Sequence, residues 1–150
     1  MDIKIPYTPR KHQAFLHKKI SESRWNVLVC HRRFGKTVCM INHLIRSALL
    51  SKLNNPRFAY IAPTFKQAKS IAWDYMKQFT AKIPHTKFNE TELRVDLPNG
   101  SRITLLGSES PDGLRGIYLD GCVIDEYANV NSKLFPEIIR PALSDRKGYC

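Results

Sequence analysis

Residues 26–37 read NVLVCHRRFGKT, and this stretch decides the fold. The apolar run Val27–Val29 predicts a short buried strand of a parallel sheet. In the turn that follows, Gly35 lets the backbone approach an anion closely, Lys36 can reach nucleotide phosphates, and the Thr37 hydroxyl can bind Mg²⁺. Apolar residues then recur at helical spacing, so a bound phosphate would lie at a helix N-terminus, where the dipole favours negative charge.

The turn departs from the usual phosphate-loop pattern G-x-x-x-x-G-K-[ST] at one place, because Cys30 stands where the first glycine belongs. Taken alone, the segment is therefore compatible with a second interpretation, a basic turn before an ordinary helix.

A second apolar strand ends in two carboxylates, in the sequence GCVIDE of residues 121–126. In an open α/β sheet, ligands collect at the carboxyl ends of the strands, beside a phosphate loop. There Asp125 would hold Mg²⁺ through its hydration shell, and Glu126 would polarise the attacking water. The alternative is a solvated acidic pair. Together with the preceding phosphate loop, the pattern predicts a Mg²⁺-dependent ATP hydrolase.

Composition indicates a single domain with a polyanionic partner. The 150 residues carry a formal net charge of +11, and residues 1–36 hold nine Lys/Arg against two Asp/Glu. Such an excess favours binding to nucleic acid, although a solvated basic surface would give the same numbers. The four cysteines show no pairing or metal-binding spacing, which is typical of a reducing, intracellular setting. No signal peptide or membrane-length apolar run is present.

Strands and helices alternate along the chain. Helices are expected at 9–21, 37–53, 65–79 and 132–143, a buried strand at 57–63, and a hairpin formed by 93–97 and 101–106 around Asn99-Gly100. This order predicts an α/β fold of the P-loop NTPase class, a parallel, doubly wound sheet with an inserted hairpin. The closing residues DRKGYC predict a turn into a further strand, so we expect the sheet to be incomplete at its C-terminal end.

Four segments in this order carry a family resemblance: YTPRKHQ, CHRRFGKT, IAPTFKQA and DGLRGIYLDGCVIDEYA. They resemble the ATPase domain of the large terminase subunit, the DNA-packaging motor of tailed bacteriophages. Large terminases often carry an arginine-rich phosphate loop without its first glycine, so Cys30 agrees with this family. The resemblance implies a RecA-like (ASCE) fold and a partial N-terminal ATPase domain over residues 1–150, without the nuclease domain of longer terminases.

The resemblance also implies roles for individual residues. Arg10 and Gln13 match a segment that senses adenine, or else they belong to an ordinary N-terminal helix. Arg33 belongs to the ATP-binding loop, with Gly35, Lys36 and Thr37. Arg32 matches an arginine finger that acts in cis, and Arg115 one offered in trans to a neighbouring subunit of a ring. The alternative for Arg115 is an exposed arginine in a turn.

Thr64, Lys66 and Gln67 follow the strand at 57–63 and resemble a segment that faces DNA. A helix N-cap at Thr64 with a solvated Lys66 is an equally good interpretation.

For a chain of this family we expect ATP and Mg²⁺ as cofactors and double-stranded DNA, the portal protein and the small terminase subunit as partners. We also expect a homo-oligomeric ring, no membrane, and a location in the cytoplasm of the bacterial host. Endonuclease activity is expected only of a longer protein with a nuclease domain.

Two other functions stay open from the sequence. VIDEYA also resembles the DExx box of helicases, so the chain could be the first RecA-like domain of a helicase or remodeller. It could also be a non-enzymatic module that binds nucleotide or DNA.

Overall fold

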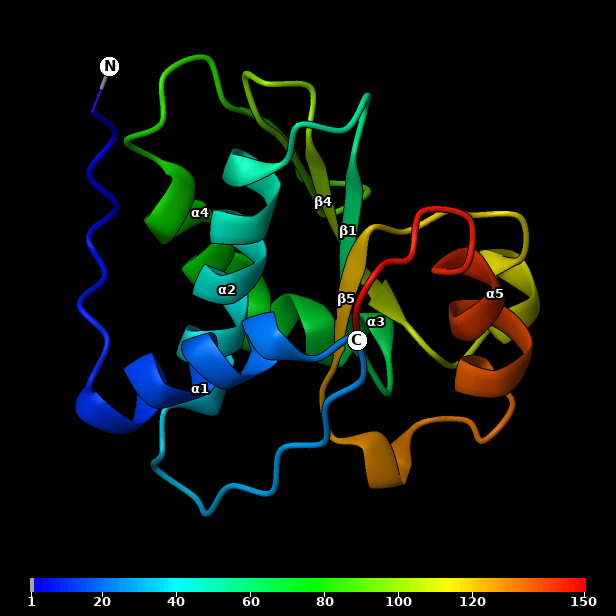
Figure 1. The fold of residues 1–150 in the computed structure, drawn as a ribbon. Helices are drawn as coiled ribbons and strands as arrows, with labels where there is room; N and C mark the ends of the chain where they lie inside the picture. Colours follow the sequence, from blue (N-terminus) through cyan, green and yellow to red (C-terminus); the bar gives the residue numbers. More distant parts are fainter. Residues whose placement is uncertain (1) are drawn as a thin grey trace.

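A computed structural model describes residues 2–150 as a mixed sheet with helices on both faces (Figure 1). The five strands lie in the order β2-β3-β4-β1-β5. They are β1 (Arg57–Ala62), β2 (Lys87–Asn89), β3 (Arg94–Asp96), β4 (Arg102–Gly107) and β5 (Gly121–Ile124). The longer helices are α1 (Lys11–Glu22), α2 (Lys36–Leu50) and α4 (Asp74–Thr80), and shorter turns are α3 (Phe65–Ala68), η1 (Lys69–Trp73), η2 (Pro111–Leu114), η3 (Tyr127–Asn129), η4 (Phe135–Ile139) and α5 (Arg140–Ala142). The expected α/β class is confirmed.

Strand β1 lies between β4 and β5 and runs parallel to both. The expected hairpin is confirmed as β3 and β4, which pair antiparallel with Asp96 opposite Arg102. Gly100 in its turn has φ 85°, a conformation that suits glycine. The edge strand β2, which pairs with β3, was not predicted from the sequence.

Side chains of β1 alternate between two cores, because successive residues of a strand point to opposite faces. Phe58, Tyr60 and Ala62 pack toward α2 and α4, whereas Ala59 and Ile61 pack toward η4 and α5. Figure 1 shows α2 and α4 on one face of the sheet and α5 on the other. The expected helix at 65–79 continues through α3, η1 and α4, with a π-helical turn in the middle.

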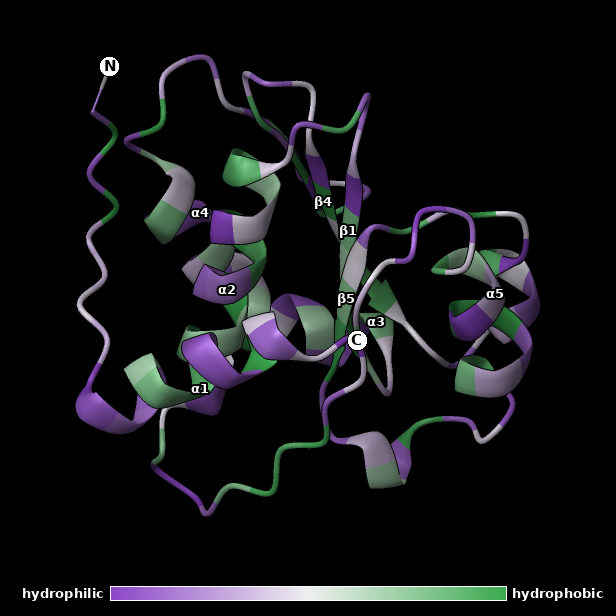
Figure 2. Cartoon of the chain, viewed as in Figure 1, coloured by the Kyte–Doolittle hydropathy of each residue, from purple (hydrophilic) through white to green (hydrophobic). Residues whose placement is uncertain are grey.

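The prediction of a buried strand at Val27–Val29 is wrong for this structure. The segment has no strand conformation, and Val27 and Val29 are 91% and 96% exposed. Figure 2 shows the hydrophobic stretch in the loop between α1 and α2. Backbone hydrogen bonds join Cys150 to Arg24 and Asn26, just before this segment. Past Asn26, no strand among the described residues pairs with this segment, so its backbone groups lack the partners that a strand needs.

A buried polar contact joins α1 to α2. The rings of His17 and His43 stack at 5.3 Å, with Nδ1 of each 3.0 Å apart, and the Tyr7 hydroxyl lies 2.9 Å from His17 Nε2. Burial, the neighbouring His17 and then Arg46 lower the pKa of His43 to about 4. Burial also lowers the pKa of His17. Both imidazoles are therefore neutral in the folded protein at neutral pH.

Among residues 2–150, no helix combines the length and apolar character that crossing a bilayer requires.

Stability should depend on pH through His43. Because its pKa is lowered on folding, the unfolded chain binds more protons between pH 6.5 and pH 4, so the free energy of unfolding falls as the pH drops through this window. The lowered pKa of His43 corresponds to a loss of about 3 kcal/mol in the free energy of unfolding by pH 4. Urea titrations at several pH values measure it; His43→Gln should flatten the curve, and His12→Gln, which removes an exposed histidine of α1, should not. Equal slopes in all three proteins would contradict the assignment.

Candidate functional site

The N-terminus of α2 and the carboxyl end of β5 meet at one edge of the sheet. Gly35 precedes α2 in the left-handed conformation, with φ 82°, and its carbonyl accepts the first helical bond from the Cys39 N–H at 3.0 Å. Lys36 and Thr37 are the first residues of the helix. Free N–H groups and the positive end of the helix dipole are thus presented together with the Lys36 ammonium.

The side chain of Gln13, from α1, contacts the backbone of this turn. Its Nε2 donates to the Gly35 carbonyl at 3.1 Å, and its Oε1 accepts from the Arg10 N–H at 2.9 Å. The side chain is only 3% exposed. A Cβ at Gly35 would lie 2.8 Å from Gln13 Nε2 and 3.9 Å from the Arg10 guanidinium, so the adenine-sensing candidates do lie against the phosphate loop.

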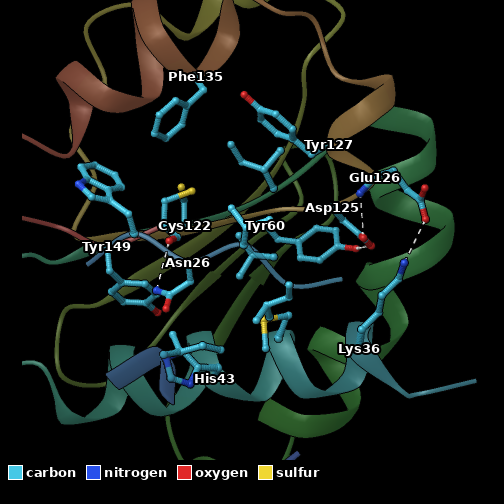
Figure 3. Close-up of a pocket in the computed structure, with 18 of the residues that line it drawn as sticks. Asn26, Lys36, His43, Tyr60, Cys122, Asp125, Glu126, Tyr127, Phe135 and Tyr149 are labelled. Atoms are coloured by element: carbon cyan, nitrogen blue, oxygen red, sulfur yellow. Dashed lines mark hydrogen bonds and ion pairs between the residues drawn. The ribbon is translucent and has the colours of Figure 1, made fainter. Parts of the chain in front are cut away.

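The two carboxylates continue β5 into the same edge. The Asp125 N–H donates to Ile61 O at 2.9 Å, which extends the β1–β5 ladder to this residue. Glu126 then adopts a left-handed backbone with φ 51°, uncommon for a residue with a side chain. Its Oε1 lies 3.5 Å from Lys36 Nζ (Figure 3). The sequence-predicted residues Lys36, Thr37, Asp125 and Glu126 are therefore brought together, as expected.

Tyr60 is a residue of this site that sequence reasoning missed. It is fully buried on β1, and its hydroxyl donates to Asp125 Oδ2 at 2.5 Å (Figure 3). The only signal in the sequence is a hydroxyl within the otherwise apolar run FAYIA, residues 58–62.

A cavity of about 680 Å³ opens beside these residues. One end is polar and is formed by Lys36, Thr37 and the carboxylates. The remainder is an apolar slot between Leu28 and Cys122, and Figure 3 shows Tyr127 and Phe135 facing it from the wall opposite α2. The polar end is where an anionic ligand fits, because Lys36 and the N-terminus of α2 lie there.

Comparison with known proteins agrees with this geometry. The family model described as "Terminase large subunit, T4likevirus-type, N-terminal" matches residues 28–146. The chain belongs to this family of large terminases. None of the curated proteins compared with the sequence matches it.

Solved terminase structures share the fold. The large terminase ATPase domain of Thermus phage P74-26 superposes with a TM-score of 0.79 at 24% identity, over 97% of this chain and 64% of that domain. A large terminase from a thermophilic bacteriophage in complex with ADP gives 0.78 at 18% identity, over 93% of this chain and 37% of that one. The same terminase in complex with ATP-gamma-S gives 0.71 at 16% identity, over 90% and 35%. The chain thus spans less than two thirds of the length of these terminases.

The arginines expected of a terminase lie at different places. Arg32 and Arg33 are exposed in the loop before Gly35, and within residues 2–150 neither forms an ion pair. Arg115 instead lies in the loop before β5, where its guanidinium bonds Asp112 at 2.9 Å and Glu137 at 3.3 Å. Both ion pairs of Arg115 are exposed, and neither partner belongs to the phosphate loop.

The candidates for DNA contact lie just past β1. Thr64 caps α3, because its hydroxyl accepts from the Gln67 N–H at 3.1 Å, so the N-cap interpretation is confirmed. Lys66 and Gln67 are exposed on this short helix. A DNA-facing role for the three residues stays a prediction.

Gly35→Ala should disrupt the phosphate loop of this terminase. A left-handed residue with a side chain costs about 1–2 kcal/mol, and the added Cβ would also press on Gln13. We expect lower stability by about that amount in urea unfolding, together with weaker binding of a fluorescent ATP analogue. Gly113→Ala is the matched control, since no atom lies within 4 Å of its added Cβ. Equal behaviour of the two variants would refute this explanation for Gly35.

Proposed function

We propose that this terminase domain binds ATP with Mg²⁺ and hydrolyses it, and that hydrolysis drives the packaging of double-stranded DNA. The observation that carries the proposal is the 3.5 Å approach of Lys36 Nζ to Glu126 Oε1 at the N-terminus of α2, beside Thr37 and Asp125. A fixed cation, free helix N–H groups and two carboxylates at one sheet edge are the parts that phosphoryl transfer to water needs.

Each side chain has a distinct task in this proposal. The ammonium of Lys36 and the N–H groups of α2 hold the β- and γ-phosphates and neutralise charge that develops on them. Glu126 orients the attacking water and accepts its proton. The ion pair between Lys36 and Glu126 is half exposed and therefore weak, so the phosphates can displace the carboxylate from the ammonium at small cost.

The residues present fit a magnesium ion. The Thr37 hydroxyl and the Asp125 carboxylate offer the oxygen ligands that Mg²⁺ prefers, and Asp125 would act through bound water. When bound, the ion would offset the negative charge of the phosphates.

Two arginines complete the proposed machinery. Arg32, exposed in the loop before Gly35, would serve as a finger in cis. Arg115 pairs with Asp112 and Glu137, outside the phosphate loop, and we propose that it acts on a neighbouring subunit of a ring.

The remaining assignments rest on the family and on charge. Related terminases are described in complex with ADP and with ATP-gamma-S, which supports ATP as the ligand here. The net charge of +11 supports DNA as a partner. We further propose that residues 1–150 form part of an N-terminal ATPase domain that works with the portal protein and the small terminase subunit in the host cytoplasm. A nuclease would belong to a longer protein. Membership of the terminase family argues against the helicase alternative.

Glu126→Gln should leave ATP binding intact while it slows ATP hydrolysis. The amide keeps the size of the side chain but cannot accept the proton of water, so we expect ATP binding to persist while turnover falls by about 10²–10⁴-fold. Equilibrium binding of a fluorescent ATP analogue and phosphate release measure the two quantities. Lys36→Ala is the comparison variant and should lose both. Normal turnover in Lys36→Ala would remove the phosphate-loop assignment.

Arg115→Ala should reduce turnover only in assembled rings. Mixing it with Glu126→Gln should restore part of the activity, because an intact Arg115 from the second variant can then serve an intact site of the first. Lys133→Ala removes another exposed positive charge and is the control: its turnover should be normal without any second variant in the mixture. If the mixture is no more active than the sum of its components, the trans role is excluded.

A further inference from the structure

Tyr60 lies at a place where an apolar residue would satisfy the fold. It is fully buried on the face of β1 that packs toward α2, between Phe58 and Ala62. The register places it opposite Leu105 of β4 and Val123 of β5. A phenylalanine would fill the same volume without burying a hydroxyl, so the polar atom needs an explanation of its own.

The hydroxyl reaches across to the next strand and meets a candidate metal ligand. Asp125 lies two residues past Val123 and therefore on the same face of β5 as the partner of Tyr60. The phenol donates to Asp125 Oδ2 at 2.5 Å, and the Glu126 N–H donates to Asp125 Oδ1 at 2.9 Å. One side chain and one backbone group thus hold the two carboxylate oxygens, and the orientation of the carboxylate is determined from both sides.

The phenol stays a donor at every ordinary pH. Burial is the main cause that raises the pKa of Tyr60, followed by the charge of Asp125 and the hydrogen bond to it. The hydroxyl therefore remains able to donate its proton to Asp125.

We propose that Tyr60 is a positioning residue for the metal site, holding the Asp125 carboxylate in the orientation that binds Mg²⁺ together with nucleotide. This inference rests on the proposed ATPase function and adds a residue to it. Tyr60 touches neither nucleotide nor metal in this role; it acts through the carboxylate, as partners of metal ligands commonly do.

The test is a metal titration of nucleotide binding, which does not depend on turnover. The affinity of a fluorescent, slowly hydrolysed ATP analogue is measured in EDTA and at increasing Mg²⁺, for the unmodified chain and for Tyr60→Phe. Removing a hydrogen-bond partner of a metal ligand typically weakens metal binding by about 10–100-fold. We expect the Mg²⁺ concentration for half-maximal tightening to rise by about tenfold or more, with the affinity in EDTA unchanged.

Tyr149→Phe is the matched control. It removes another hydroxyl that lines the cavity, one that bonds Ser47 at 2.9 Å rather than a carboxylate. Its magnesium titration should match that of the unmodified chain. Thermal unfolding by circular dichroism gives the stability of each variant, and the affinities are measured well below the lowest midpoint.

The outcomes separate the two proposals. An unmodified chain whose nucleotide binding ignores Mg²⁺ would overturn the proposed function and this inference with it. A Tyr60→Phe variant with the magnesium dependence of Tyr149→Phe would overturn the positioning role alone. Equal weakening in EDTA and in Mg²⁺ would also overturn it, because that result identifies Tyr60 as a general support of the pocket.

Discussion

The parallel pairing of β1 with β5 is the constraint on which the rest of the site depends. The ladder does not stop at the end of β5: the bond from the Asp125 N–H to Ile61 O carries it one residue further. Asp125 therefore leaves the sheet in a defined direction, beside the helix that begins at Lys36. Because backbone hydrogen bonds set this register, the distance between the lysine and the carboxylates does not depend on flexible side chains alone.

The second support comes from α1. Gln13 uses both ends of its amide to join the Gly35 carbonyl to the backbone of Arg10, so the N-terminal segment and the phosphate loop form one unit. Farther along the same two helices, the neutral pair His17 and His43 closes the contact between α1 and α2. A displacement of α1 would therefore be transmitted to the N-terminus of α2.

Contacts in the site differ in solvent exposure, and this difference separates ion pairs that a ligand can replace from a hydrogen bond that persists. The pairs of Lys36 with Glu126 and of Arg115 with Asp112 and Glu137 are solvent-exposed. Exposed ion pairs contribute only about 0–1 kcal/mol, so a ligand or a neighbouring subunit can replace them. The bond from Tyr60 to Asp125 starts from a fully buried ring, where an unpaired hydroxyl is costly, and it should persist through a catalytic cycle. The exposed ion pairs can thus be replaced by a ligand, whereas the buried bond from Tyr60 to Asp125 stays in place.

Local chemistry in the sequence determined the phosphate turn, the Asn99-Gly100 hairpin and the carboxylate strand, because glycine freedom, helix periodicity and strand patterning act over a few residues. It therefore sufficed to expect Lys36, Thr37, Asp125 and Glu126 at one sheet edge. Only the tertiary structure could decide matters that depend on a distant neighbour. Val27–Val29 has the composition of a strand but remains a loop, since a strand needs a partner for its backbone groups. The task of Tyr60 likewise became visible only when β1 was laid beside β5, because 65 positions along the chain separate its hydroxyl from Asp125.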